Sequence, residues 1–320
     1  MRRGSRHVAR RKPRRNSSFK PRLPETDEPP SLTQLEQFSQ LSLRRWLAFG
    51  KTLTELHTVQ FFALELERQR RSADLIEALR ASLGPGEPFE KWARIVDYRY
   101  CLAPLSIAGS LKNDGGRFNI GAGLNPAAFP AFPALYIAED YPTAFRERFG
   151  TDFAAVRRDG LAPHELALRT PGSFTHVALR GQLELVLDVG DLSALQRFAA
   201  VLRDFSMPDR VRQLARRLGM RAPPGLVRTP GGLQRQLLHP NWRILPAQFD
   251  LPANCQVFGR IAAAAGAHGI RYPSARQSNR YCLALFPQNW SATSSFVEVM
   301  DGAPSTAQPV RIDGNTGALQ

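Results

Sequence analysis

Cysteine is scarce in this chain of 320 residues, and its three copies lie far apart. Cys101, Cys255 and Cys282 form no Cys-x-x-Cys pair and have no histidine at ligand spacing. This spacing argues against a disulfide framework and against a zinc site. Sparse cysteine of this kind fits a reducing compartment, so we expect a cytoplasmic protein.

The sequence also lacks a long hydrophobic run. The most apolar stretch, residues 261–270, is interrupted by Gly266, His268 and Gly269, and it is about half as long as the roughly 18 residues that cross a bilayer. We therefore expect no membrane span. With 43% hydrophobic and 22% charged residues, the composition is that of a folded globular protein. The length allows two domains, or one domain with an extension.

Acidic residues are absent from the first 22 positions, where ten Lys and Arg gather. The whole chain has 43 Lys and Arg against 28 Asp and Glu, a net charge of +15, so this segment supplies ten of the fifteen excess charges. Mutual repulsion and few apolar residues predict a disordered basic arm and linker over residues 1–30. No hydrophobic stretch follows the arginines, so we do not interpret them as a secretion signal.

Hydrophobic spacing predicts a helical extension over residues 31–90. Ser31 and Gln34 form a capping box, and apolar residues then recur at helical spacing to about position 71. A second helical run, residues 74–83, stops at Gly84-Pro85-Gly86. The Leu and Phe stripe is interpreted as packing surface without a chemical role.

From residue 91 the pattern changes to short β-rich runs alternating with helical runs. The β-rich runs are residues 94–101, 134–138, 175–179, 183–189 and 281–286, and the helical runs are 142–149, 192–205, 209–218 and 257–267. This alternation predicts a mixed α/β or α+β domain over residues 91–295, and of the two we expect α+β with a mixed sheet. A proline-rich connection, residues 221–252, interrupts it, and residues 296–320 are predicted to be a polar tail.

Glycine and arginine are concentrated between residues 99 and 147. Gly115, Gly116 and Arg117 open the run Gly-Gly-Arg-Phe-Asn, and Arg99 precedes it. Glycine lets a backbone approach a ligand closely, and guanidinium groups pair with phosphate oxygens, so a diphosphate is a plausible guest. Ordinary turns use the same residues, and this segment alone leaves both interpretations open.

The helix predicted over residues 142–149 places an acid where it is disfavoured. Asp140 is its expected cap and Gly150 its expected end, so Glu147 falls in the last turn. A carboxylate there costs about 0.3 to 1 kcal/mol through the helix dipole. Glu147 therefore either pairs with a neighbouring arginine or has a functional role.

The order of these motifs resembles the RES domain family, which is named for an Arg, a Glu and a Ser and includes toxins of bacterial toxin–antitoxin pairs. The resemblance rests on motifs in the family's order: Tyr98-Arg99-Tyr100, Gly-Gly-Arg117-Phe118-Asn119, Leu135-Tyr136, Glu147, Tyr272-Pro273-Ser274 and Leu283-Ala284-Leu285-Phe286-Pro287. It covers roughly residues 91 to 290. Within this range Glu147 is the acid whose place on its helix needs an explanation.

The resemblance implies a compact fold related to ADP-ribosyltransferase toxins, with NAD as substrate and no metal. It implies an enzyme that cleaves the nicotinamide–ribose bond, as an NAD phosphorylase, an NAD glycohydrolase or an ADP-ribosyltransferase. Carried over by motif, Glu147, Arg99 and Ser274 are the expected catalytic residues. The expected NAD-binding residues are Arg99, Arg117, Tyr136 and Gly116. A carboxylate suits this reaction, because cleavage develops positive charge on the ribose.

Three departures and one alternative accompany the resemblance. The chain adds the arm and the helical extension, enlarges the segment between Glu147 and Ser274, and has Cys282 where many relatives carry Asn. The alternative function is a nucleic-acid-associated protein that binds non-specifically through the arm, with a degenerate RES-like scaffold. A helix-turn-helix antitoxin is a possible partner. A Ser-His-Asp hydrolase is not expected, because no Gly-x-Ser-x-Gly elbow precedes His239 or His268.

Overall fold

The computed structural model describes residues 40–150, 174–221, 223, 225–300 and 305–316. The predicted basic arm and the capping residues Ser31 and Gln34 lie outside the described residues. The chain divides into two compact units, Met1–Ala48 and Phe49–Gln320. In the first unit the described residues form the beginning of one helix, and that helix continues into the second unit.

Two helices confirm the predicted helical N-terminal segment. Helix α2 spans Gln40–Arg70 and helix α3 spans Ser72–Arg80. Leu56 and Leu64 of α2 and Leu75 and Leu79 of α3 are buried in the main hydrophobic core. Part of the predicted apolar stripe is therefore packed inward, whereas Phe62 and Leu66 of the same stripe are 48% and 54% exposed.

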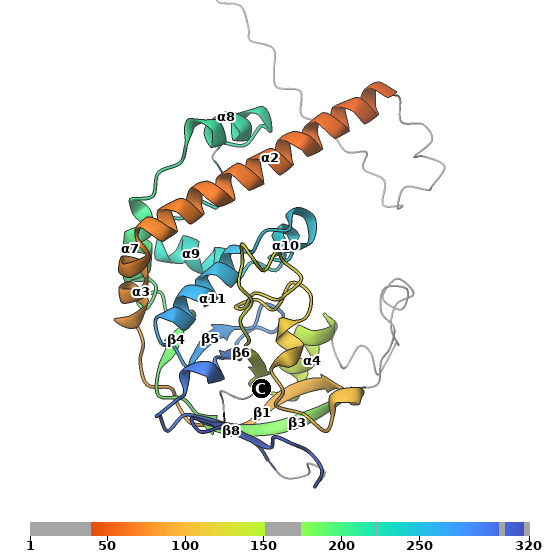
Figure 1. Cartoon of the computed structure of the whole chain (residues 1–320), viewed down its shortest axis with the longest axis vertical. Coiled ribbons are helices and arrows are strands. Elements are labelled where there is room, and N and C mark those ends of the chain that lie inside the picture. The colour runs from red at the N-terminus through yellow and green to blue at the C-terminus, as the bar shows by residue number, and fades with distance from the viewer. Residues whose placement is uncertain (1–39, 151–173, 222, 224, 301–304, 317–320) are drawn as a thin grey trace, which may run out of the picture. The chain divides into compact units, whose positions relative to one another are not determined.

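A single eight-stranded mixed sheet forms the centre of the second unit (Figure 1). Its order is β4-β5-β6-β2-β1-β3-β7-β8, and the only parallel pair among these strands is β4 with β5. The strands are β1 (Phe89–Asp97), β2 (Leu135–Ala138), β3 (Phe174–Gln182), β4 (Val186–Asp188), β5 (Gly269–Pro273), β6 (Tyr281–Leu285), β7 (Phe296–Val299) and β8 (Arg311–Asp313). With the helices around it, this sheet confirms the predicted α+β class.

Alternation along the central strands divides their side chains between two cores. In β2, Leu135 and Ile137 belong to one buried cluster, whereas Ala138 belongs to the other, larger cluster and Tyr136 packs against it. The paired strand β6 divides in the same way, with Leu283 and Leu285 on the first face and Cys282 and Ala284 on the second. A strand's period of two produces this division. Tyr136 and Cys282 consequently lie on the same face, the one covered by helices.

The remaining helices of the second unit are labelled in Figure 1. They are α4 (Tyr141–Phe149), α7 (Gln196–Arg203), α8 (Asp209–Arg217), α9 (Pro230–Leu237), α10 (Ile244–Phe249) and α11 (Asn254–Ala264), with short 3-10 turns η1 (Tyr98–Tyr100), η2 (Ala108–Leu111) and η3 (Pro287–Asn289). Helix α4 packs on β1 and β2, and α11 packs on α3, α9 and β5.

The structure differs from the sequence expectations at several boundaries. The first strand begins at Phe89 and ends at Asp97, and the following Tyr98–Tyr100 form the turn η1. The proline-rich connection contains α9 and α10, where Thr229 caps α9 through a bond from the Gly232 N–H and Pro230 occupies the first turn. In the sequence, a proline in the first turn of a helix looks like a proline in a loop unless the preceding capping residue, here Thr229, is recognised. Strands β7 and β8 lie in the range expected to be a polar tail.

Candidate active site

Helix α4 begins and ends where the sequence predicts. The Asp140 carboxylate accepts a hydrogen bond from the Thr143 N–H at 2.8 Å, Pro142 occupies the first turn, and the helix ends before Gly150. These signals fix the helix register and place Glu147, half-buried, in the last turn. The carboxylate is thereby aimed at the loop that follows β5.

Glu147 bonds to a serine rather than to an arginine. The Ser274 hydroxyl donates to Oε1 of Glu147 at 2.6 Å, and the Ala275 N–H donates to the same oxygen at 3.0 Å. The Ser274 hydroxyl in turn accepts from the N–H groups of Arg276, at 3.2 Å, and Gln277, at 3.0 Å. Two residues predicted for the same site, 127 positions apart, are therefore brought together and oriented.

Two buried side chains of the helix-covered sheet face lie next to this pair. Tyr272 of β5 stands opposite Cys282 of β6 in the antiparallel register. Burial raises the pKa of both groups, and the nearby negative charge of Glu147 raises it further. Both side chains are therefore neutral at ordinary pH. Both belong to the larger buried cluster, and neither is a base in this surrounding.

The glycine-rich loop is held by backbone hydrogen bonds and by the side chain of Asn119. Asn119 is fully buried: its amide donates to the carbonyls of Ser110 and Phe132, and its Oδ1 accepts from the Gly116 N–H and from the Tyr136 hydroxyl. The Tyr136 hydroxyl also accepts from the Phe118 N–H at 2.8 Å. Burial raises the pKa of Tyr136, so this hydroxyl stays protonated and keeps donating.

Gly116 is required for the packing of Tyr136. A Cβ atom added at Gly116 would lie 2.5 Å from the Tyr136 ring. The expectation that Gly116 presents its N–H to a ligand stays a prediction, because in this structure that N–H bonds Asn119.

Helix α11 supplies residues that sequence reasoning missed. Gln256 is fully buried, and its amide donates to the carbonyls of Asp114, Gly116 and Asn119 at 2.6, 3.1 and 3.0 Å. Gly259 lies one turn further, where a Cβ would meet the Phe118 carbonyl oxygen at 2.0 Å. One glutamine and one glycine therefore let the loop lie directly on the helix.

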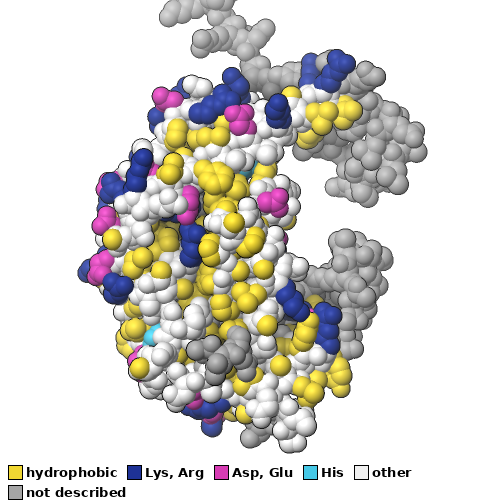
Figure 2. All heavy atoms as spheres, in the orientation of Figure 1, with side chains coloured by type: hydrophobic (Ala, Val, Ile, Leu, Met, Phe, Trp, Pro, Cys, Tyr) yellow, Lys and Arg dark blue, Asp and Glu magenta, His cyan; other side chains and the backbone are white. Residues whose placement is uncertain are grey.

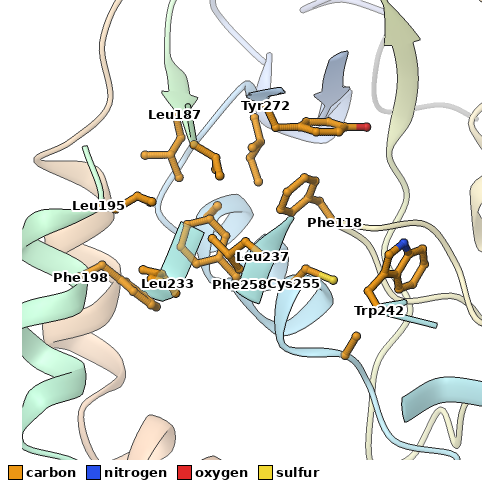
Figure 3. Packing of buried hydrophobic residues seen from close by; sticks show 14 of the residues in the cluster. Phe118, Leu187, Leu195, Phe198, Leu233, Leu237, Trp242, Cys255, Phe258 and Tyr272 are labelled. Atoms are coloured by element: carbon orange, nitrogen blue, oxygen red, sulfur yellow. The ribbon is translucent and has the colours of Figure 1, made fainter. Parts of the chain in front are cut away.

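Arg117 is buried and anchored to a distant segment. Its Nη1 donates to the carbonyls of Leu237 and His239, both at 3.1 Å, and its Cζ lies 5.9 Å from the centroid of the Trp242 ring. Figure 3 shows Trp242 with Phe118, Cys255 and Tyr272 among the side chains of the larger buried cluster. The positive charge of Arg117 lowers the pKa of Tyr272 and Cys282 against the larger effect of burial.

Arg99 lies elsewhere, on the exposed turn η1. Its side chain is 74% exposed, forms a 3.7 Å ion pair with Asp97 and stacks on Tyr100 with its Cζ 4.9 Å from the ring centroid. Asp97 also accepts a 2.6 Å hydrogen bond from Arg148, the neighbour of Glu147. Arg99 is thus linked to the end of α4 through two ion pairs, but the structure does not pack it against Glu147 or Ser274.

The predicted residues therefore fall into two groups. In the interior, Glu147 bonds Ser274, Gly116 packs against Tyr136, and Arg117 is anchored next to Trp242. Arg99 stands apart on the surface. Gln277 adds a further polar group beside Ser274: its Oε1 is buried and accepts no hydrogen bond within the described residues. Such an acceptor is unusual in a folded protein and is a candidate contact for a ligand N–H or hydroxyl.

None of the described helices is both long and apolar enough to span a membrane. No three His, Cys, Asp or Glu side chains in that part of the chain gather as a metal site would require.

The α+β domain thus contains a carboxylate held by a serine hydroxyl and, on the glycine-rich loop, a buried arginine. The chain belongs to the RES domain family, whose family model matches residues 91–307. Comparison with curated proteins gives no match. Among solved structures, the crystal structure of the M. tuberculosis MbcT-MbcA toxin-antitoxin complex is similar, with 15% identity, coverage of 75% of this chain and 91% of that chain, and a TM-score of 0.40.

Proposed function

We propose that this protein is a toxin-like enzyme that consumes NAD by cleaving the nicotinamide–ribose bond. Membership in the RES domain family supports an NAD-degrading, toxin-like enzyme in general terms. The observation that carries the specific reaction is the pair of Glu147 and Ser274, joined at 2.6 Å within the matched range. A carboxylate fixed by a hydroxyl and a backbone N–H is a preorganised negative charge.

The proposed chemistry uses that charge on the ribose. The bond between C1″ of the nicotinamide ribose and the nicotinamide nitrogen breaks, and its electron pair stays on the nitrogen, which becomes neutral. An oxygen of phosphate, water or a protein hydroxyl, or another protein nucleophile, forms the new bond to C1″ and releases its proton to solvent. Both bonds to Glu147 use Oε1, so Oε2 is directed away from Ser274 and can face the ribose hydroxyls and the developing cation.

The other predicted residues have positioning roles in this proposal. Arg117 and Arg99 bind the diphosphate, Tyr136 stacks on the nicotinamide or ribose, and Ser274 orients both Glu147 and the sugar. Gly116 brings the loop close to the substrate. Arg117 is already oriented by two carbonyls, so its part of the site is formed before the substrate arrives.

Product analysis tests the reaction. The full chain is incubated with NAD, with and without phosphate, and the products are separated by chromatography. We expect free nicotinamide together with ADP-ribose, its 1″-phosphate or a modified protein, according to the acceptor. Unchanged NAD in the presence of correctly folded protein would contradict the proposal.

The Glu147→Gln variant tests the assigned residue. Removing the charge while keeping the shape should lower turnover by about 10² to 10⁴-fold, in the range of a lost catalytic acid or electrostatic stabiliser. Glu87→Gln, at an exposed position ahead of β1, is the matched control and should keep wild-type turnover. Equal activity of Glu147→Gln and wild type would show that another group stabilises the sugar.

The remaining expectations about partners and location stay predictions. We expect a toxin-like enzyme of this kind to act in the cytoplasm and to be neutralised by an antitoxin, with a helix-turn-helix protein as the candidate. The alternative function, non-specific nucleic-acid binding, depends on the basic arm, which lies outside the described residues. On the face shown in Figure 2, Lys and Arg side chains lie in separate groups with hydrophobic side chains between them.

A further inference from the structure

The buried ring of Trp242 contacts two guanidinium groups. The Cζ of Arg243 lies 4.3 Å from the ring centroid and that of Arg117 lies 5.9 Å from it. Trp242 is only 7% exposed and belongs to the enlarged segment between Glu147 and Ser274. Because Arg117 also bonds the carbonyls of Leu237 and His239, that segment is fastened to the candidate site and brings Arg243 with it.

A third cation approaches from the loop after β5. The Arg276 N–H donates to the Ser274 hydroxyl at 3.2 Å, so this residue starts directly beside the Glu147–Ser274 pair. The pKa of Arg243 is lowered, first by burial and then by the positive charges of Arg117 and Arg276. The Tyr136 side chain acts in the opposite direction and raises the pKa of Arg243. Arg117 and Arg243 therefore share one buried ring, and Arg276 begins beside the Glu147–Ser274 pair.

Other arginines near this region are neutralised by acids. Arg260 pairs with Glu65, Arg271 with Asp188, and Arg280 with both Glu139 and Asp140. Within the described residues, by contrast, no Asp or Glu forms an ion pair with Arg117, Arg243 or Arg276. Convergent cations without a counter-charge repel one another, and an anion bound among them removes that cost.

We propose that Arg243 and Arg276, together with Arg117, form an anion subsite that takes a phosphoryl group next to the Glu147–Ser274 pair. The identity of its natural ligand rests on the proposed function. The phosphoryl group belongs either to the diphosphate of the dinucleotide or to free phosphate that attacks the ribose. Guanidinium forks suit either source, because they donate paired hydrogen bonds to phosphate oxygens.

Equilibrium binding tests the subsite without requiring turnover. The full chain is titrated with inorganic phosphate, and separately with ADP-ribose, by calorimetry. Arg243→Ala and Arg276→Ala should each weaken the binding of one or both ligands at least tenfold, while Arg243→Lys, which keeps the charge but loses the fork, should weaken it less. Arg235→Ala, at an exposed position of α9, is the matched control and should bind like wild type.

The two titrations distinguish the two sources. Weakened binding of phosphate assigns the subsite to the free ion, and weakened binding of ADP-ribose alone assigns it to the diphosphate. If both Ala variants bind both ligands as wild type does, with unchanged melting temperatures, the subsite does not exist. Because no NAD is cleaved in this experiment, a wild type that binds phosphate tightly but leaves NAD intact would overturn the proposed reaction and leave the subsite standing.

Discussion

The two arginines expected to bind the same diphosphate occupy opposite surroundings. Arg117 is 8% exposed and bonds two backbone carbonyls, whereas the Arg99 side chain is 74% exposed and has one long ion pair. The first is part of the interior that supports the site, and the second is part of its rim. Two residues of one predicted role can therefore differ in what their loss does to the fold.

The comparison separates stability from binding. An interior arginine whose donors satisfy buried carbonyls contributes to folding before any ligand arrives. A surface arginine contributes little to folding, because its ion pair is solvated and holding a long side chain in one geometry costs conformational entropy. Loss of the interior arginine, Arg117, is thus expected to destabilise the fold, whereas loss of the surface arginine, Arg99, is expected to weaken the binding of NAD.

Arg117→Ala has the largest expected effect. Two carbonyls lose their donor and Trp242 loses a stacked neighbour, so the free energy of unfolding should fall by about 2 to 4 kcal/mol. Urea denaturation followed by tryptophan fluorescence measures this change. Arg235→Ala is the control on the same helix that Arg117 contacts, and it should change stability by less than about 0.5 kcal/mol. A fully stable Arg117→Ala protein would remove the distinction between interior and rim.

Gly116→Ala should destabilise by about 1 to 3 kcal/mol, because its new methyl group must displace the Tyr136 ring. Gly109→Ala is the matched control, since nothing lies within 4 Å of a Cβ at that position. Melting temperatures of the two variants give the comparison. If both melt like wild type, Tyr136 moves without cost and the loop is less tightly packed than the structure indicates.

Arg99→Ala should leave the free energy of unfolding within about 0.5 kcal/mol of wild type. Its expected effect is on the substrate: KM for NAD should rise several-fold while the melting temperature stays constant. Steady-state kinetics and thermal melting on the same preparation check both parts. A marked loss of stability without a change in KM would assign Arg99 to the fold instead.

The cysteines give the smallest test of the same division. Burial raises the pKa of Cys255 to about 12 and raises that of Cys282 well above its usual range, so both remain thiols at pH 8.5 and are poor nucleophiles. Cys101, half-buried next to the rim, is the one expected to react. A thiol titration should count one group in the native protein and three in denaturant, and Cys101→Ser should reduce the native count to zero.

Local sequence signals were sufficient to predict helix α4 and the position of Glu147 in it. Asp140, Pro142 and Gly150 define α4 within a residue or two, and they place Glu147 correctly in its last turn. The short apolar runs of β2 and β6 also appear where they were predicted. These elements depend on residues adjacent in sequence, for which capping and alternation are direct evidence.

The supporting contacts could not be predicted in the same way. Arg117 finds its partners 120 and 122 positions away, and both are backbone carbonyls, which every residue carries. Gln256 likewise bonds three carbonyls of a loop about 140 positions earlier. Helices α9 and α10 were missed because their proline-rich surroundings resemble a connection, although Thr229 and Pro230 mark the start of α9. Sequence patterns predict elements, whereas such long-range acceptors have no pattern.

The three bonds from Gln256 tie the motion of the glycine-rich loop to that of helix α11. A loop held in this way is a poor lid, since lifting it strips three acceptors from a fully buried amide and separates Phe118 from Gly259. Loop and helix should therefore open as one cooperative unit, with their amide protons exchanging at a common rate. A substrate is therefore expected to enter without that loop lifting from helix α11.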